Sequence, residues 1–305
     1  MIGKICGTGS SIPVKIMDND DLSNMVDTND AWIRERTGVE KRHIAESEST
    51  VSMAVEAGRR ALAQTGIRPE ELDMIVVSTM SPDAVLPCTA CEVQKAIGAE
   101  GAVCFDLQAA CTGFIFAYNT AQAYIQSNMC RTVLLIGSER LSRLVDWTDR
   151  GTCILFGDGA GAAVLKAAEG RAYLPVSHSD GKKGEALTCD RYIHMDGRAV
   201  FQFAVTRVPE VIREVLTKNE LIMDDIDYFV LHQANRRIVE AVAKRLRQPI
   251  EKFPMNLQEY GNTSSASIPI LLDEMNRSGK LKKGQKLVVA GFGAGLSWGA
   301  SIVEW

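Results

Sequence analysis

The fold is first indicated by the run Leu72-Asp73-Met74-Ile75-Val76-Val77-Ser78, whose pattern returns as Ile226-Asp227-Tyr228-Phe229-Val230-Leu231-His232 in the second half of the chain. Both runs are short and rich in β-branched or aromatic residues, which is typical of a buried strand. A predicted helix precedes each run, at residues 53–65 and at residues 208–219. The recurrence indicates that the chain contains two related halves.

Three further pairs of segments match in the same order downstream. They are Phe105-Asp106-Leu107-Gln108 with Met255-Asn256-Leu257-Gln258, the predicted helices 112–125 and 264–275, and the strand-like runs 132–137 and 286–291 that end in glycine. Alternation of strands and helices predicts largely parallel sheets with helices packed on their faces.

Composition places the chain among ordinary globular proteins and argues against several functions. Of its 305 residues, 46% are hydrophobic and 24% are charged, and the formal net charge is -4. An acidic protein of this balance is a poor match for nucleic acid or an anionic membrane. No run approaches the ~18 apolar residues of a membrane-spanning helix, and the first residues lack the charged leader of a signal peptide. The 8 cysteines are scattered and do not resemble a disulfide scaffold, so we expect a cytoplasmic location.

Cys111 is the strongest candidate for a nucleophile. It lies in Gln108-Ala109-Ala110-Cys111-Thr112-Gly113-Phe114, between a predicted strand and a predicted helix. A helix N-terminus presents free backbone N–H groups and the positive end of the helix dipole, and both favour a thiolate. The small neighbouring residues leave room for a substrate carbonyl. Taken alone, however, a cysteine beside alanines is more often an inert core residue.

Two further side chains fall at comparable places in the second half. His232 ends its predicted strand, and Asn262 stands in Gly261-Asn262-Thr263-Ser264-Ser265-Ala266-Ser267, ahead of a predicted helix. Ligands of parallel α/β sheets gather beyond the carboxyl ends of the strands, so these residues are expected to converge on Cys111. Taken singly, His232 fits a structural histidine equally well, and Asn262 fits a helix cap.

The chain resembles the β-ketoacyl-[acyl-carrier-protein] synthase III family, the initiating condensing enzymes of type II fatty acid synthesis in the thiolase superfamily. The resemblance covers essentially the whole length. The motifs that carry it are Ala109-Ala110-Cys111-Thr112-Gly113-Phe114, Gly157-Asp158-Gly159-Ala160-Gly161-Ala162, His232-Gln233-Ala234-Asn235-Arg236-Arg237-Ile238, Gly261-Asn262-Thr263-Ser264-Ser265-Ala266-Ser267 and Gly291-Phe292-Gly293-Ala294-Gly295. It implies a thiolase-like α/β fold in a layered αβαβα arrangement. Two pseudo-symmetric halves would form it, 1–167 with Cys111 and 168–305 with His232 and Asn262.

The resemblance implies a decarboxylative Claisen condensation of an acyl-CoA primer with malonyl-[acyl carrier protein], giving 3-oxoacyl-[acyl carrier protein], CO2 and CoA. Cys111 would hold the acyl group, while His232 and Asn262 would donate hydrogen bonds to the malonyl thioester oxygen as the enolate forms. The backbone N–H groups of Cys111 and Ala294 would form a second oxyanion hole, although glycine is the expected residue at 294. No metal is implied, and no cofactor beyond the CoA thioester substrate.

The resemblance also assigns binding residues. The CoA site would contain Thr28, Trp32, Arg36, Thr37, Arg150, Gly151, Gly197, Phe201, Ala234 and Asn235. Trp32 and Arg150 would enclose the adenine. Leu86 matches a gate residue that reaches across a homodimer into the acyl pocket of the other copy, which allows primers longer or more branched than acetyl. Arg236, Arg237 and Lys244 belong to a basic helix expected to dock the acidic acyl carrier protein, and of these Arg237 matches a docking position of the family, although such a charged run is as often a solvated face.

Other interpretations of the motifs fit less well. Neither glycine-rich motif, at 157–161 or 291–295, is followed by the helix that a dinucleotide site requires. Cys88-x-x-Cys91 has the spacing of half a zinc site or a redox pair, but it opens a helix and has no second pair, so both cysteines are interpreted as structural. Two rival functions remain. One is a specialised acyltransferase or starter condensing enzyme of polyketide or alkylquinolone synthesis, and the other is a papain-like cysteine hydrolase. The sequence does not place the segment 178–194.

Overall fold

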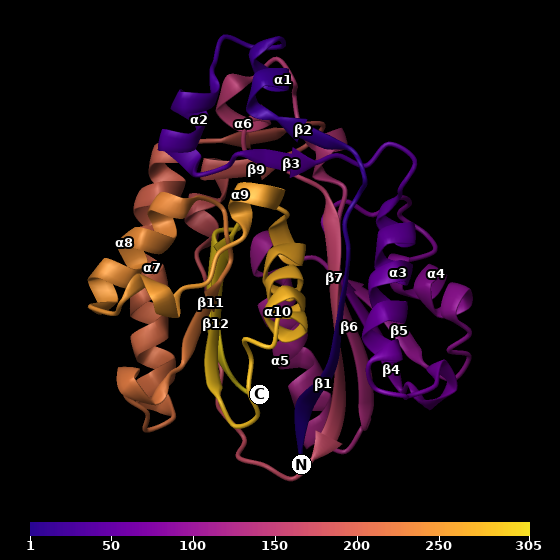
Figure 1. Ribbon diagram of the computed structural model, residues 1–305. Coiled ribbons are helices and arrows are strands. Elements are labelled where there is room, and N and C mark those ends of the chain that lie inside the picture. The colour runs from indigo at the N-terminus through magenta and orange to yellow at the C-terminus, as the bar shows by residue number, and fades with distance from the viewer.

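The computed structural model describes residues 1–305 and contains two main β-sheets (Figure 1). The first has five strands in the order β1-β7-β6-β4-β5, and the second has four in the order β11-β12-β13-β8. The strands of the first sheet are β1 (Ile2–Ser11), β4 (Met74–Ser78), β5 (Val103–Leu107), β6 (Thr132–Glu139) and β7 (Gly159–Ala168). Those of the second are β8 (Val176–Ser179), β11 (Tyr228–Leu231), β12 (Lys286–Gly293) and β13 (Ser297–Glu304).

The two sheets repeat one arrangement of strands. Along β1-β7-β6-β4 the pairs are antiparallel, antiparallel and parallel, and β8-β13-β12-β11 shows the same series. The predicted pseudo-symmetric α/β fold is therefore confirmed. The expectation of largely parallel sheets is wrong at β7 and β13, which run antiparallel to both of their neighbours because the connections from β6 to β7 and from β12 to β13 return at the same end of the sheet. The exact division at residues 167 and 168 stays a prediction.

Helices cover both sheets and fill the space between them (Figure 1). α5 (Gly113–Gln126) and α10 (Ser267–Arg277) lie in the middle, where their apolar side chains pack against strands of both sheets. α3 (Thr50–Ala63) and α4 (Thr89–Ile97) cover the outer face of the first sheet. α7 (Gly197–Lys218) and α8 (Arg236–Leu246) cover the outer face of the second. The layered αβαβα arrangement is therefore confirmed. No helix is both long enough and apolar enough to cross a membrane.

The central helices begin in tightly packed surroundings, which fixes the backbone near Cys111. A Cβ atom on Gly113 would lie 2.0 Å from the Ser78 hydroxyl oxygen, and one on Gly137 would lie 2.4 Å from the carbonyl oxygen of Ser265. Only glycine fits at such separations. The start of α5, the end of β6 and the loop before α10 are consequently in direct contact.

Short elements form a cap at the end of the molecule where β4, β6 and β11 terminate (Figure 1). They are β2 (Ile16–Asp18), α1 (Asn19–Ser23), α2 (Asp30–Thr37), β3 (Lys41–His43), α6 (Arg150–Cys153), β9 (Leu187–Cys189), β10 (Ile193–Met195) and α9 (Leu257–Tyr260). Short 3-10 helices occur at η1 (Pro69–Glu71), η2 (Ala110–Thr112), η3 (Leu141–Leu144), η4 (Gly181–Ala186), η5 (Met223–Asp225), η6 (Ile250–Lys252) and η7 (Ser264–Ala266). The segment 178–194 thus contains η4 and the hairpin of β9 and β10.

Two predicted elements differ from the structure. The helix expected at 208–219 begins at Gly197, where the Asp196 side chain accepts hydrogen bonds from two backbone N–H groups of its first turn. The segment 255–258, matched in sequence to β5, forms no strand and leads into α9. The reason is that the backbone N–H groups of Asn256 and Leu257 donate to Gln233 Oε1 and are not available to a neighbouring strand.

Candidate active site

Cys111, His232 and Asn262 line one cavity of about 250 Å³. Their side chains come from the turn before α5, the end of β11 and the loop before α10, so the pseudo-symmetric placement expected from the sequence brings them together. Most of the other lining residues are apolar, which suits an acyl chain. The catalytic roles of the three residues stay predictions.

Cys111 stands in η2, directly ahead of α5. The preceding Ala110 has a φ of 46°, in the left-handed region, and turns the chain sharply before the cysteine. Burial raises the pKa of the Cys111 thiol to about 12. The thiolate expected from the helix N-terminus is therefore not favoured in this structure, because burial removes the water that would solvate a charged sulfur. The thiol has to lose its proton once substrate is in place.

His232 follows β11 and is almost fully buried. Its Nδ1 atom lies 2.8 Å from the Oγ atom of Ser267, whose hydroxyl makes no other hydrogen bond. Nε2 is buried without a partner, and the residue lines the cavity. Burial lowers the pKa of His232 to about 3, so the ring is neutral at physiological pH. If the Ser267 hydroxyl donates to Nδ1, the ring hydrogen sits on Nε2 and forms a donor toward the cavity.

Asn262 is held by its backbone and by its own side-chain oxygen. Its N–H donates to the carbonyl of Leu155 at 2.8 Å, its carbonyl accepts from Gly157 N at 3.1 Å, and its Oδ1 accepts from Ser264 N at 2.8 Å. The preceding Gly261 has a φ of 65°, and a Cβ atom there would lie 2.7 Å from the Leu155 carbonyl oxygen. The Nδ2 group of Asn262 makes no hydrogen bond and supplies a second donor to the cavity.

Two backbone donors lie near the thiol. The N–H groups of Cys111 and Ala294 make no hydrogen bond. Ala294 belongs to the turn that joins β12 to β13, and a Cβ atom on the preceding Gly293 would lie 2.8 Å from Cys111 N. This contact holds the turn beside the cysteine and supports the predicted oxyanion hole. Because β12 runs directly into β13 and no helix follows, the rejection of a dinucleotide loop there agrees with the structure.

The predicted CoA residues gather on the cap and on the first turns of α7 and α8. Thr28 precedes α2, Trp32, Arg36 and Thr37 lie in α2, Arg150 and Gly151 begin α6, Gly197 and Phe201 belong to the start of α7, and Ala234 and Asn235 precede α8. The Asn235 side chain donates to the Arg36 carbonyl at 2.9 Å, which joins α8 to α2. Among these residues, Ala234 alone lines the cavity.

Trp32 and Arg150 are in direct contact. The guanidinium carbon of Arg150 lies 5.0 Å from the centroid of the Trp32 ring, and its Nη1 donates to the Asp27 carbonyl at 2.8 Å. A ring held between the two side chains would need a gap of roughly 7 Å, twice the contact distance. The structure therefore brings the pair together, but the pair has to open to enclose an adenine.

The remaining predicted residues lie outside the cavity. Leu86 stands in the loop between β4 and α4 and is 82% exposed, so its side chain is free to contact another copy of the chain. On α8, Arg236 lies 3.6 Å from Glu240, whereas Arg237 and Lys244 form no ion pair. The Sγ atoms of Cys88 and Cys91 are 3.4 Å apart at the start of α4.

Sequence reasoning did not assign several residues that belong to the site. Ser264 lines the cavity with its buried hydroxyl unpartnered, and Ser267 contacts His232. The serine-rich run 264–267 ahead of an apolar helix is the signal that could have found them. The β9–β10 hairpin lines the cavity with Leu187, Thr188, Cys189, Ile193 and Met195. Its strands are too short to leave a periodic pattern in the sequence.

Comparisons with known proteins agree on one family. Residues 105–181 match the model of 3-oxoacyl-[acyl-carrier-protein] synthase III, and residues 216–305 match the model of its C-terminal part. The β-ketoacyl-[acyl-carrier-protein] synthase III of Clostridium acetobutylicum is 46% identical over 99% of this chain and 98% of that protein. The crystal structure of the 3-oxoacyl-[acyl-carrier-protein] synthase III from Aquifex aeolicus has a TM-score of 0.97 at 44% identity, covering 99% of this chain and 100% of that one. The priming β-ketosynthase from the R1128 polyketide pathway has a TM-score of 0.96 at 36% identity, covering 99% and 96%.

Proposed function

The chain belongs to the 3-oxoacyl-[acyl-carrier-protein] synthase III family, and we propose that it works through an acyl group held on Cys111. It is an acyltransferase with the initiating condensing function of fatty acid synthesis. The observation that supports the proposed site is the convergence of a thiol, two unpartnered side-chain donors and two unpartnered backbone N–H groups on one apolar cavity.

The first half of the proposed reaction transfers the acyl group. The sulfur of Cys111 attacks the carbonyl carbon of an acyl-CoA, and the oxygen that becomes negative accepts hydrogen bonds from the N–H groups of Cys111 and Ala294. The tetrahedral intermediate then collapses, and CoA leaves as a thiol with the proton that Cys111 gave up. An acyl thioester remains on Cys111. Because the pKa of the Cys111 thiol is raised to about 12, its proton leaves as the new bond forms.

The second half forms the carbon–carbon bond. Malonyl-[acyl carrier protein] loses CO2, and the electron pair of the broken bond moves into the thioester as an enolate. His232 Nε2–H and Asn262 Nδ2–H donate to the enolate oxygen. The enolate carbon attacks the acyl-Cys111 carbonyl and displaces the thiolate, which gives the 3-oxoacyl product. Burial keeps His232 neutral, which suits a hydrogen-bond donor that does not titrate during turnover.

The proposed binding residues serve the two half-reactions separately, one set for CoA and the other for the acyl carrier protein. Trp32 and Arg150 open to hold the adenine of CoA, and Arg237 and Lys244 contact the acidic carrier protein. Arg237 and Lys244 are seven positions apart on α8 and therefore share one face. Arg236 contributes less, because Glu240 already neutralises it. We propose no resident cofactor or metal, and we place the enzyme in the cytoplasm.

We further propose a homodimer. β5 is the edge strand of the first sheet, and Val103 on it is 61% exposed. Asp106 of β5 accepts hydrogen bonds from the first two N–H groups of α4, each at 2.8 Å, which ties this edge to the loop that carries Leu86. An edge strand has unpaired backbone N–H and C=O groups, and an exposed apolar loop beside it offers surface to bury. Together they favour pairing with a second copy of the chain.

The experiment that tests the function is condensation of malonyl-[acyl carrier protein] with a panel of straight and branched acyl-CoAs, alongside Cys111→Ala. We expect a 3-oxoacyl product that the variant does not form. Acyl-enzyme without condensation product would favour the specialised acyltransferase instead. Continued release of CoA together with the free carboxylic acid in the absence of malonyl, beyond one equivalent per enzyme, would favour the cysteine hydrolase. A product formed only with an unusual primer would favour a starter enzyme of polyketide type, which the similarity to the R1128 ketosynthase makes a specific rival.

A further inference from the structure

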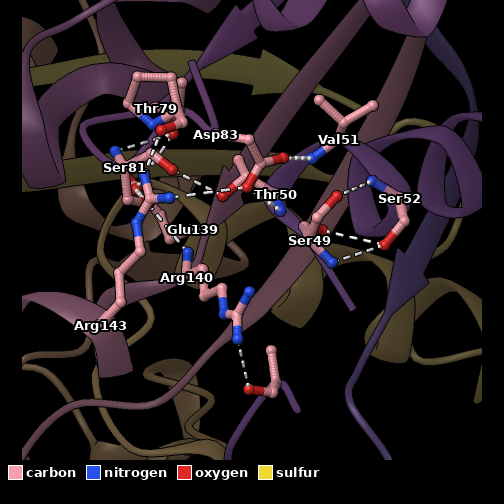
Figure 2. Close-up of polar contacts among 12 residues, drawn as sticks. Ser49, Thr50, Val51, Ser52, Thr79, Ser81, Asp83, Glu139, Arg140 and Arg143 are labelled. Atoms are coloured by element: carbon pink, nitrogen blue, oxygen red, sulfur yellow. Dashed lines mark hydrogen bonds and ion pairs between the residues drawn. The ribbon is translucent and has the colours of Figure 1, made fainter. Parts of the chain in front are cut away.

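Glu139 is a fully buried carboxyl group that the proposed reaction does not use. It ends β6 and lies between two loops, residues 79–81 after β4 and residues 264–266 ahead of α10. Figure 2 shows it among Thr79 and Ser81. The first loop belongs to the half that contains Cys111 and the second to the half that contains Asn262. Glu139 thus joins the two halves immediately behind the cavity.

The hydrogen bonds of Glu139 identify which of its oxygens is the carbonyl. Oε2 faces donors only, namely Ser81 Oγ at 2.6 Å, Met80 N at 3.1 Å and Thr79 Oγ1 at 3.3 Å. Oε1 has one hydrogen-bond partner, the hydroxyl of Ser265, at 2.7 Å, and the Ser264 hydroxyl is a further neighbour of the carboxyl group. The Ser265 hydroxyl also lies 3.0 Å from the carbonyl oxygen of Ser78. Oε2 therefore behaves as an acceptor. If Oε1 were also an acceptor, it and the Ser78 carbonyl oxygen would both need the single hydrogen of the Ser265 hydroxyl.

Counting hydrogens decides the protonation state. A hydroxyl has one hydrogen, so an ionised Glu139 would leave Ser265 between two acceptors with only one of them satisfied. A proton on Oε1 removes the conflict. Oε1–H then donates to Ser265, and the Ser265 hydroxyl donates to the Ser78 carbonyl. Buried polar groups are nearly always hydrogen-bonded, so the arrangement with every partner satisfied is favoured.

The charges around Glu139 agree with a neutral acid. No lysine, arginine or histidine lies within ion-pair distance of its carboxyl group. The Arg140 guanidinium is directed to the carbonyls of Ala45 and Glu46, and Arg143 pairs with Asp83 (Figure 2). Burial raises the pKa of Glu139. Cys111 in η2 and Asp158 ahead of β7 are the nearby titratable groups, and neither is a cation. The cations on the elements packed against β6 are directed elsewhere: Arg59 of α3 donates to the Ala96 carbonyl, Arg60 pairs with Glu56, and Lys166 of β7 lies opposite Thr132 at the far end of β6.

We propose that Glu139 is a positioning residue held as a neutral carboxylic acid, whose proton fixes Ser265 and thereby the loop that carries Asn262. Ser265 in turn packs against Gly137 and Gly113, so this loop is registered against the start of α5. Neutrality also serves Cys111, because a negative charge on Glu139 raises the pKa of that thiol. The inference deepens the proposed function and rests on its assignment of Asn262.

An infrared measurement tests the protonation state without any substrate. The difference spectrum between the native protein and Glu139→Gln at neutral pH should contain the carbonyl band of a protonated carboxylic acid, shifted in heavy water. Asp158→Asn is the matched control. Asp158 is also buried, but both of its oxygens face donors only, from Ala45 and Ser142, so its substitution should leave the band in place. Absence of the band in the native protein would overturn the proposal.

Alkylation of Cys111 by iodoacetamide gives a second readout. If Glu139 is neutral, Glu139→Gln removes no charge, and the alkylation rate at about pH 8 should change by less than about twofold. If Glu139 is ionised, its removal lowers the pKa of Cys111 by about one unit and raises the rate roughly tenfold, which would contradict the proposal. The alkylated peptide is identified by mass spectrometry, because the chain has 8 cysteines.

Positioning is tested by separating the two halves of the reaction. Glu139→Leu and Ser265→Ala each break the chain of hydrogen bonds, so malonyl decarboxylation should slow by about tenfold or more while acylation of Cys111 stays within about twofold. Glu139→Gln can still donate to Ser265 and should restore decarboxylation. Equal decreases in the rates of acylation and decarboxylation would show that Glu139 only stabilises the fold and would contradict the positioning role. Failure of condensation in the native protein would leave the infrared and alkylation results unaffected, so the two failures are distinguishable.

Discussion

At the scale of single residues, the two ring nitrogens of His232 have different neighbours, and the difference sets what the ring can do. Nδ1 meets the Ser267 hydroxyl at 2.8 Å, and Nε2 makes no hydrogen bond. If the Ser267 hydroxyl donates to Nδ1, Ser267→Ala leaves Nδ1 without a donor and allows the hydrogen to move from Nε2 to Nδ1. We expect malonyl decarboxylation to fall by about 10- to 100-fold, because one enolate donor is lost for part of the time. The release of CO2 measures this rate.

The first half-reaction provides the control for Ser267. CoA release during acylation of Cys111 should stay within about twofold in Ser267→Ala, since that step does not use His232. Ser267→Thr keeps the hydroxyl and should decarboxylate malonyl at close to the native rate. Normal decarboxylation in Ser267→Ala would show that another contact fixes the tautomer.

Burial of His232 also predicts how stability depends on pH. The pKa of this ring is about 3 in the folded protein and near 6.5 when unfolded, so below pH 6.5 the unfolded chain binds a proton that the folded chain does not. The free energy of unfolding therefore falls as pH drops from 6.5 toward 3. At pH 5 the loss from this residue is about 2 kcal/mol. Urea unfolding at pH 7 and pH 5 measures this loss. The free energy of unfolding should fall by about 2 kcal/mol more in the native protein than in His232→Gln between these two pH values.

At the scale of elements, the contact between α2 and α6 predicts how CoA is recognised. An adenine between Trp32 and Arg150 replaces their direct contact, and stacking on an aromatic ring contributes about 1–3 kcal/mol. Trp32→Ala should raise KM for acyl-CoA roughly tenfold and leave acylation by acyl-pantetheine, which has no adenine, unchanged. Trp32→Phe retains a ring and should recover part of the loss. An equal effect on both donors would show that Trp32 only anchors the cap.

α8 carries the prediction for the carrier protein. Arg237→Glu reverses a charge that no acidic residue neutralises, so KM for malonyl-[acyl carrier protein] should rise about fivefold at low salt and less as salt is added. The acylation rate with acyl-CoA should stay nearly constant. Lys283→Glu is the matched control, since this exposed lysine lies in the loop that contacts the C-terminal residue. A similar rise in both variants would point to net charge and not to docking.

The elements also show what the sequence could predict. The short apolar runs that became β4 and β11, and the apolar helices that became α5 and α10, were predictable because burial on both sides leaves a continuous apolar pattern. The fate of 255–258 was not, because it depends on the Gln233 side chain, which lies far away in sequence. The early start of α7 was missed for a related reason, since its cap at Asp196 follows a hairpin without a pattern.

At the scale of the whole molecule, pseudo-symmetry explains why the candidate site was more predictable than its surroundings. Cys111 and Asn262 precede corresponding helices, so the duplicated pattern alone places them at related points. Contacts across the two halves leave no such trace. The Glu139–Ser265 hydrogen bond joins residues 126 positions apart, and no pattern in either local segment predicts it. Contact of this kind depends on the packing of α5 and α10 between the sheets.

In the proposed homodimer, Leu86 of one copy should set the primer preference of the other copy. Leu86 is exposed beside the edge strand β5 and does not line the cavity of its own chain, so if it is a gate residue we expect primer choice to be set in trans. Leu86→Phe should narrow the pocket and lower kcat/KM for branched acyl-CoAs relative to acetyl-CoA. Mixed dimers of Leu86→Phe with Cys111→Ala, isolated through two different tags, have one competent Cys111, on the chain that carries phenylalanine.

The primer profile of these mixed dimers decides between a gate in trans and a gate in cis. If Leu86 acts in trans, the competent pocket receives the native leucine from the Cys111→Ala chain, and the mixed dimer accepts branched primers as the native enzyme does. If the residue acts in cis, the mixed dimer keeps the narrowed profile of Leu86→Phe. A monomeric native protein in sedimentation, or a Leu86→Phe enzyme with an unchanged profile, would remove Leu86 from the acyl pocket altogether. If branched primers are accepted by the mixed dimer but not by the Leu86→Phe dimer, each acyl pocket must be built from residues of two copies of the chain.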